Sequence, residues 1–218
     1  NSPYKATNIQ DFWRRWHITL SRFLRDYIYI PLGGNKKSSF RTYSNLLATF
    51  VIGGLWHGAG WTFIFWGFLH GMALVIHRLW SNLGFKMWTW LAWLITFNFV
   101  NVAWIFFRAR EWEDAIKVLS SMFSLNNVVL PNFLESKLQF LKSFEIIFGG
   151  FVENIGGDYF TPLWFVLAFV LVLAFKNSMY YLNIKLNKKY LILSIFLFSY
   201  AFITSLVSSS NVFLYFNF

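Results

Sequence analysis

The chain has 218 residues, of which 57% are hydrophobic and 23% aromatic, whereas only 13% are charged. A soluble domain is about one quarter charged, so this composition and the several long apolar runs exclude a soluble enzyme and predict an integral membrane protein. The absence of cysteine excludes thiol catalysis, disulfide bonds and cysteine-ligated metal. The net charge of +10 is explained by cytoplasmic Lys and Arg enrichment in membrane proteins, so we expect no nucleic-acid partner.

Residues 7–30 are predicted to form one amphipathic helix. Thr7 with Gln10 three residues later matches a capping box, and apolar side chains then recur at helical spacing on one face. Arginines occupy the other face, and His17 lies at its edge. The helix is too charged to span a membrane, so we expect it at the interface.

A charge-free stretch from Tyr43 to Ile76 follows. As one helix it would be about 51 Å long, too long for one crossing of a ~30 Å hydrocarbon core and short for two crossings with a turn. We therefore predict a short, broken helix pair over 43–80, with the break at "HGAG", residues 57–60. Irregular backbone at membrane depth is tolerated only where it is buried in protein or lines a wet cavity.

Three later segments are predicted to be transmembrane spans, at 88–107, 160–175 and 190–207. Asn98 and Asn101 lie one turn apart in the first span, where we expect hydrogen bonds to a neighbouring helix. Charge spacing over 107–123 predicts a further helix at the surface. The fold class is thus an all-α polytopic membrane protein, with 1–218 as a single membrane domain.

The charges are distributed unevenly along the chain. Seven of the nine acidic residues lie between Arg108 and Asp158. Basic residues cluster elsewhere, at Lys36, Lys37, Arg41, Arg78, Lys86, Lys176, Lys185, Lys188 and Lys189. Because Lys and Arg in short loops mark the cytoplasmic side, we expect the basic clusters in the cytoplasm and 108–158 outside. The sequence begins without methionine or a signal-peptide pattern, so we expect a fragment of a longer protein.

His57 stands in "GGLWHGAGW", residues 53–61. It is open to three interpretations: a core histidine bonded to a backbone carbonyl, an interfacial aromatic residue between Trp56 and Trp61, or a base in a buried site. Ionisable residues inside a membrane mark functional sites because their burial is costly. Gly58 and Gly60 are expected to allow a left-handed turn and close approach of a substrate.

The remaining histidines carry weaker signals. His17 lies beside Arg14, and tryptophans are interleaved with the charges there. That mixture suits either a solvated interfacial helix or a groove for an anionic group. His70 and His77 are seven residues apart, whereas a two-histidine metal site needs a spacing of three or four, so no metal site is predicted. We expect His70 to be a packing residue or one that supports a site residue from behind, and His77 to be interfacial.

Gly67 and Gly71 form a pair of small residues one turn apart. Small residues at this spacing let two membrane helices approach closely. We therefore predict close packing of the second helix of the broken pair at these glycines.

Two blocks in order, "FWRRWHITLSRFLRDYIYIPLGG" and "GGLWHGAGWTFIFWGFLHG", with "FLYFNF" at the end, resemble the C-terminal half of the membrane-bound O-acyltransferase family. The similarity is greatest to its bacterial branch, which acetylates alginate, peptidoglycan and related polymers. The resemblance implies a ring of helices around a central funnel in the bacterial inner membrane, with His57 as the essential histidine and His17 as a second one.

The resemblance also implies the chemistry. A sugar hydroxyl is a poor nucleophile, so His57 is expected to remove its proton as it attacks a thioester or ester carbonyl, while His17 orients the carbonyl or relays the proton. Arg14 and Arg15 are expected to meet the phosphate of an acyl donor such as acetyl-CoA or an acyl carrier. The candidate substrate-binding residues are completed by Trp56, Gly58 and Trp61.

The expected partners are the lipid bilayer, the acyl donor, and a polysaccharide or cell-wall polymer as acceptor, reached directly or through a periplasmic acyltransferase. No permanently bound cofactor is expected. Two other classes of protein remain open: a transporter or channel in which His57 relays protons, and a purely structural membrane subunit.

Overall fold

The computed structural model describes residues 1–218 except 125–127, 145, 151–156, 159, 182–186 and 208–218. The chain forms two compact units, Asn1–Phe175 and Lys176–Phe218, and each is described by itself. The terminal "FLYFNF", on which part of the resemblance rests, lies outside the described residues.

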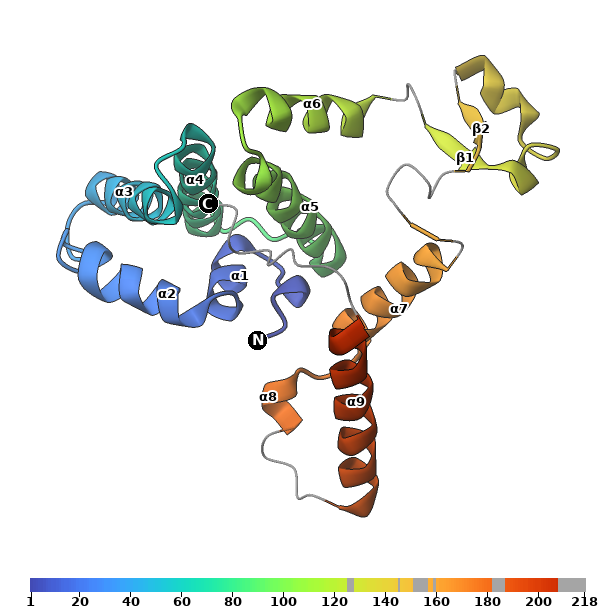
Figure 1. Cartoon of the computed structure of the whole chain (residues 1–218). Helices are drawn as coiled ribbons and strands as arrows, with labels where there is room; N and C mark the ends of the chain where they lie inside the picture. Colours follow the sequence, from blue (N-terminus) through green and yellow to red (C-terminus); the bar gives the residue numbers. More distant parts are fainter. Residues whose placement is uncertain (125–127, 145, 151–156, 159, 182–186, 208–218) are drawn as a thin grey trace. The chain divides into compact units, whose positions relative to one another are not determined.

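Helices make up most of both units (Figure 1). In chain order the elements are η1 (Pro3–Lys5), α1 (Ile9–Arg15), α2 (Ile18–Leu24), η2 (Arg25–Tyr29), α3 (Ser39–His57), α4 (Trp61–Asn82), α5 (Thr89–Arg108), α6 (Trp112–Phe123), β1 (Val129–Pro131), η3 (Asn132–Leu134), η4 (Gln139–Phe144), β2 (Ile147–Gly149), α7 (Thr161–Ala174), α8 (Ser178–Tyr181) and α9 (Lys188–Val207). The short parallel pair β1–β2 departs from the all-α expectation. Its strands lie in the acidic segment, whose pattern had indicated only a surface helix.

The stretch predicted as one helix over 7–30 is divided into α1, α2 and the π-helical η2. The chain breaks at His17, whose φ of 37° is left-handed. The Ser21 hydroxyl donates to the carbonyl oxygen of Trp13 at 3.1 Å, which satisfies a group that the break leaves without a helical partner. The cap of α1 also differs from the expectation, because Asn8 and not Thr7 accepts a hydrogen bond from the Asp11 amide.

The broken pair over 43–80 is the hairpin of α3 and α4, which lie side by side in Figure 1. The two helices approach so closely that a Cβ added at Gly54 would lie 2.3 Å from the Phe63 carbonyl oxygen, and one at Gly67 would lie 2.2 Å from that of Phe50. The predicted close packing at Gly67 is confirmed.

The expectation that both helices of the pair are short was wrong. α4 has 22 residues, about 33 Å of helix, because it continues beyond the charge-free stretch and past Arg78. α3 has 19 residues and begins before Arg41, which gives about 28 Å.

Among the residues that the structure describes, three helices are long and apolar enough to cross a membrane, namely α4, α5 and α9. α7 is a shorter apolar helix of 14 residues, where a span over 160–175 had been predicted. No residue of the most apolar window of α9 is buried among the residues that the structure describes.

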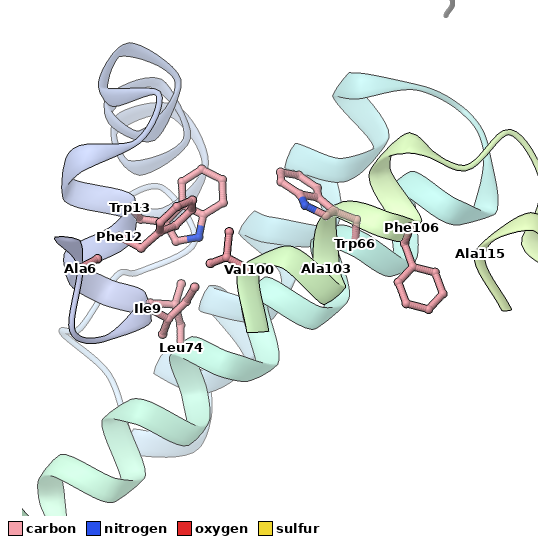
Figure 2. Close-up of a cluster of buried hydrophobic side chains, with 10 residues drawn as sticks. All are labelled: Ala6, Ile9, Phe12, Trp13, Trp66, Leu74, Val100, Ala103, Phe106 and Ala115. Atoms are coloured by element: carbon pink, nitrogen blue, oxygen red, sulfur yellow. The ribbon is translucent and has the colours of Figure 1, made fainter. Parts of the chain in front are cut away.

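A core of buried side chains joins the N-terminal segment to the hairpin and α5 (Figure 2). Its members come from four helices and the turn before α1, and they are Ala6, Ile9, Phe12, Trp13, Trp66, Leu74, Val100, Ala103, Phe106 and Ala115. This packing holds α1 against α4 and α5, and so positions the break that carries His17.

Candidate active site at the α3–α4 junction

His57 is the last residue of α3, directly before the turn into α4. Its half-buried ring lies edge-on to three aromatic rings. The ring centroids are 4.9 Å from Trp56, 5.3 Å from Trp66 and 5.0 Å from Phe107, with interplanar angles of 76° to 88°. An apolar wall on several sides fixes the orientation of the imidazole while part of it stays accessible.

His17 reaches the same region from the break between α1 and α2. Its Nδ1 lies 3.5 Å from the hydroxyl of Thr19, and its ring is close enough to His57 for a charge on one to act on the other. The fold therefore places two histidines that are far apart in the sequence within range of electrostatic interaction.

The candidate substrate-binding residues around His57 lie in different surroundings. Trp56 is 61% exposed and Trp61 is 78% exposed, so both indoles are available to a ligand or to lipid. Gly58 has extended backbone with φ 170°, and a Cβ there would lie 2.6 Å from the Phe63 ring. The expected left-handed turn is absent at Gly58 and also at Gly60, where φ is −77°. The glycine at 58 serves close packing instead.

The two candidate arginines of α1 are not equivalent. Arg15 donates from Nε to Asp11 Oδ1 at 2.8 Å, so its charge is already paired within the helix. Arg14 is exposed and lies near enough to His77 of α4 to affect it electrostatically. Arg14 is therefore the better candidate to bind an anionic group of a ligand.

A second group of basic residues lies at the end of α4 that carries His77. Arg78, next to His77, donates from Nη1 to Asn35 Oδ1 at 3.0 Å. This bond ties the loop that carries exposed Lys36 and Lys37 to the far end of α4. Basic groups thus collect at the end of the hairpin opposite to His57.

Several residues around the histidines were not predicted to belong to the site. Trp66 touches both His57 and His70, with ring centroids 5.3 Å and 4.8 Å away. His70 is fully buried, and its Nδ1 accepts a hydrogen bond from Trp13 Nε1 at 3.2 Å. The spacing of four between Trp66 and His70 was the available signal, since it places both on one face of a helix.

An open groove of about 930 Å³ lies between α5 and α6, lined in part by Trp104, Arg108 and Lys117. Neither His57 nor His17 lines it. The groove is therefore a separate feature from the histidine pair.

Comparison with known proteins adds a family relationship. The model of the family described as "MBOAT, membrane-bound O-acyltransferase family" matches residues 1–110. The whole chain is 50% identical to a peptidoglycan O-acetyltransferase of Helicobacter pylori, of which it spans 42%. Over 65% of the chain it is 46% identical to a probable alginate O-acetylase AlgI of Azotobacter vinelandii, and over 52% it is 30% identical to a teichoic acid D-alanyltransferase of Bacillus subtilis. The chain spans less than one third of each of these two proteins.

Proposed function

Because the chain belongs to the membrane-bound O-acyltransferase family, we propose that the full-length protein is a multi-pass enzyme of the bacterial inner membrane. It transfers an acyl group, acetyl in the first instance, from a cytoplasmic thioester to hydroxyls of an extracytoplasmic polysaccharide or cell-wall polymer. The observation that carries the proposal is that His57, at the end of α3, and His17, at the break between α1 and α2, lie within range of electrostatic interaction. Family membership favours this enzyme over a transporter or a structural subunit.

His57 is the general base in this proposal. The reference pKa of histidine is about 6.5, so a neutral ring is available to accept a proton at pH 7. The acceptor hydroxyl gives its proton to His57 while its oxygen attacks the thioester carbonyl carbon. The carbon–sulfur bond then breaks, and the leaving thiolate takes a proton back from the His57 imidazolium. His17 orients the acyl carbonyl or relays this proton.

The donor enters from the basic end of the hairpin. Arg14 and the loop with Lys36 and Lys37 bind the phosphates of acetyl-CoA or of a phosphopantetheine carrier by charge-assisted hydrogen bonds. The exposed indoles of Trp56 and Trp61 then flank the reacting group.

The acceptor is the polymer outside the membrane. The relatives are named for peptidoglycan, alginate and teichoic acid, all of which are polymers that bear hydroxyl groups. We propose an acceptor of this class, reached directly or through a periplasmic acyltransferase. In the full-length protein the helices described here form part of a ring around a funnel with His57 and His17 at its narrow floor.

The test is acetyl transfer by the full-length protein in membranes, with a labelled acetyl donor. We expect His57→Ala to lower turnover by about 10²-fold or more, the usual contribution of a general base, with unchanged expression and thermal stability. Asn98→Ala, at an exposed position of α5 whose side chain bonds to its own helix, is the control and should retain most activity. Turnover of the His57 variant equal to that of the control would exclude His57 as the base.

A further inference from the structure

The protonation of the buried His70 ring follows from its one hydrogen bond. Its Nδ1 accepts from the indole N–H of Trp13 at 3.2 Å, so that nitrogen carries no proton. A neutral imidazole holds its proton on the other nitrogen. Nε2 of His70 is therefore an N–H donor.

This donor has a neighbour of the same kind. Nε2 of His70 and Nε1 of Trp66 are both buried, and neither has a hydrogen-bond partner among the residues that the structure describes. The two rings lie one turn apart on α4 with centroids 4.8 Å apart, and Figure 2 shows the Trp66 and Trp13 indoles extending toward one another across the cluster.

The surroundings do not explain how these donors are satisfied. Phe12 stacks on the His70 ring and Phe99 meets it edge-on, and neither side chain has an acceptor oxygen. A buried N–H without an acceptor is costly, and native proteins seldom leave one so. Two such groups side by side indicate an acceptor that binds between them.

We propose that Trp66 Nε1–H and His70 Nε2–H together bind one acceptor oxygen beside His57. An oxygen about 2.9 Å from each nitrogen would satisfy both N–H groups at the ordinary length of N–H···O bonds. Water supplies this oxygen in the resting protein, or the carbonyl of the acyl group supplies it during transfer. The second source rests on the proposed function.

The position gives such a site a chemical role. Trp66 also lies edge-on to His57, with centroids 5.3 Å apart, so an oxygen bound at its N–H is near the base. Attack on a thioester carbonyl moves negative charge onto the carbonyl oxygen, and N–H donors in an apolar environment stabilise that charge. If the oxygen belongs to water, the same two donors instead complete a buried network that holds Trp66 against His57.

The direct test is ¹⁵N-histidine solid-state NMR on the full-length protein in lipid, with His70 assigned from the His70→Asn spectrum. We expect a protonated, hydrogen-bonded Nε2. Magnetisation transferred from water to this N–H identifies bound water, and a shift on adding a non-transferable thioether analogue of the acyl donor identifies the carbonyl site. A proton on Nδ1, an Nε2–H with the shift of an unbonded group, or a bonded Nε2–H that responds to neither addition would overturn the proposal.

Matched variants separate the donor from its packing. In His70→Asn the side-chain amide can still accept from Trp13 but does not reach the Nε2 position, whereas in His70→Gln it does. Trp66→Phe removes the other N–H and keeps an aromatic ring, and Trp90→Phe at an exposed site is the control.

For the carbonyl source we expect kcat to fall by about 10²-fold in His70→Asn and Trp66→Phe, as on loss of one oxyanion donor, with partial recovery in His70→Gln. For the water source we expect a lowered Tm with kcat near that of the parent. Parental kcat and Tm in both donor-deleted variants would contradict the site. The NMR result does not depend on His57, so an active His57→Ala variant would refute the proposed base without deciding this site.

Discussion

The two glycines of the α3–α4 turn differ in what a side chain would meet. A Cβ at Gly58 would lie 2.6 Å from the Phe63 ring, whereas one at Gly60 would have only ordinary contacts of 3.6 Å and longer. Phe63 packs against Phe107, which in turn packs against His57. We therefore expect Gly58→Ala to displace this row of rings and lower turnover, with Gly60→Ala close to the parent. Equal turnover of the two variants, measured at equal expression, would show that the row does not position His57.

His17 combines an unusual backbone with a candidate chemical role. A left-handed conformation costs about 1–2 kcal/mol for most residues, and Asn tolerates it better than others. We expect His17→Asn to keep the stability of the parent but to lower turnover, because the imidazole is lost. We expect His17→Ala to lower turnover similarly and to lower the Tm as well. If His17→Asn has parental turnover, the ring has only a structural role at the break.

Single residues also show where sequence patterns mislead. Asn98 and Asn101 were expected to bond to a neighbouring helix, but each side-chain amide donates to a carbonyl four residues earlier in α5, at 2.8 Å. A polar side chain in an apolar helix needs a hydrogen-bond partner, and a backbone carbonyl of its own helix can be that partner. His70 is buried, as either a packing or a supporting residue would be, but nothing in the sequence indicated its bond to Trp13.

At the scale of the element, the glycine contact between α3 and α4 decides how closely the hairpin packs. A Cβ at Gly67 would lie 2.2 Å from a backbone oxygen of Phe50, which cannot move without separating the helices. We expect Gly67→Ala to destabilise the protein by about 1–3 kcal/mol, the usual cost of overpacking. Gly53→Ala is the matched control, because its Cβ would meet only the flexible end of Leu24, at 3.0 Å. Thermal unfolding in lipid distinguishes them, and equal Tm values would contradict the close backbone contact.

Long elements were predictable from the sequence and short breaks were not. The apolar runs indicated α4, α5 and α9, and the glycines of "HGAG" indicated where α3 ends. The break at His17 was missed because the periodicity of apolar residues continues across it, so the pattern over 7–30 is also that of one helix. What separates α1 from α2 is a local backbone conformation stabilised by the Ser21 hydroxyl. The periodicity of apolar residues does not indicate such a conformation.

At the scale of the whole molecule, His57 and the basic groups lie at opposite ends of one hairpin. α3 is about 28 Å long, close to the ~30 Å of a hydrocarbon core, with Arg41 near its start and His57 at its end. The sequence had suggested a break deep in the membrane, because the charge-free stretch is too short for two full crossings. Both helices extend past the charged residues that bound the charge-free stretch, so the length of that stretch underestimated the lengths of α3 and α4.

This arrangement makes a topology prediction. Arg78 holds the loop of Lys36 and Lys37 at the basic end of the hairpin, and basic loops mark the cytoplasmic side. α5 has 20 residues, about 30 Å of helix, so it carries the chain to the other side, where acidic α6 follows. We therefore expect Lys36 in the cytoplasm and Glu113 outside. Both residues have exposed side chains.

Cysteine labelling of the full-length protein measures this, because the 218 residues contain no cysteine of their own. In a background with any other cysteine replaced, a membrane-impermeant maleimide added to spheroplasts should label Glu113→Cys at once and Lys36→Cys only after permeabilisation. Labelling in the opposite order would show that the protein has the reverse orientation in the membrane. His57 would then lie toward the cytoplasm, and the basic loop could no longer meet a cytoplasmic acyl donor. Labelling of both positions from outside would show that at least one of α3, α4 and α5 does not cross the bilayer as its length indicates.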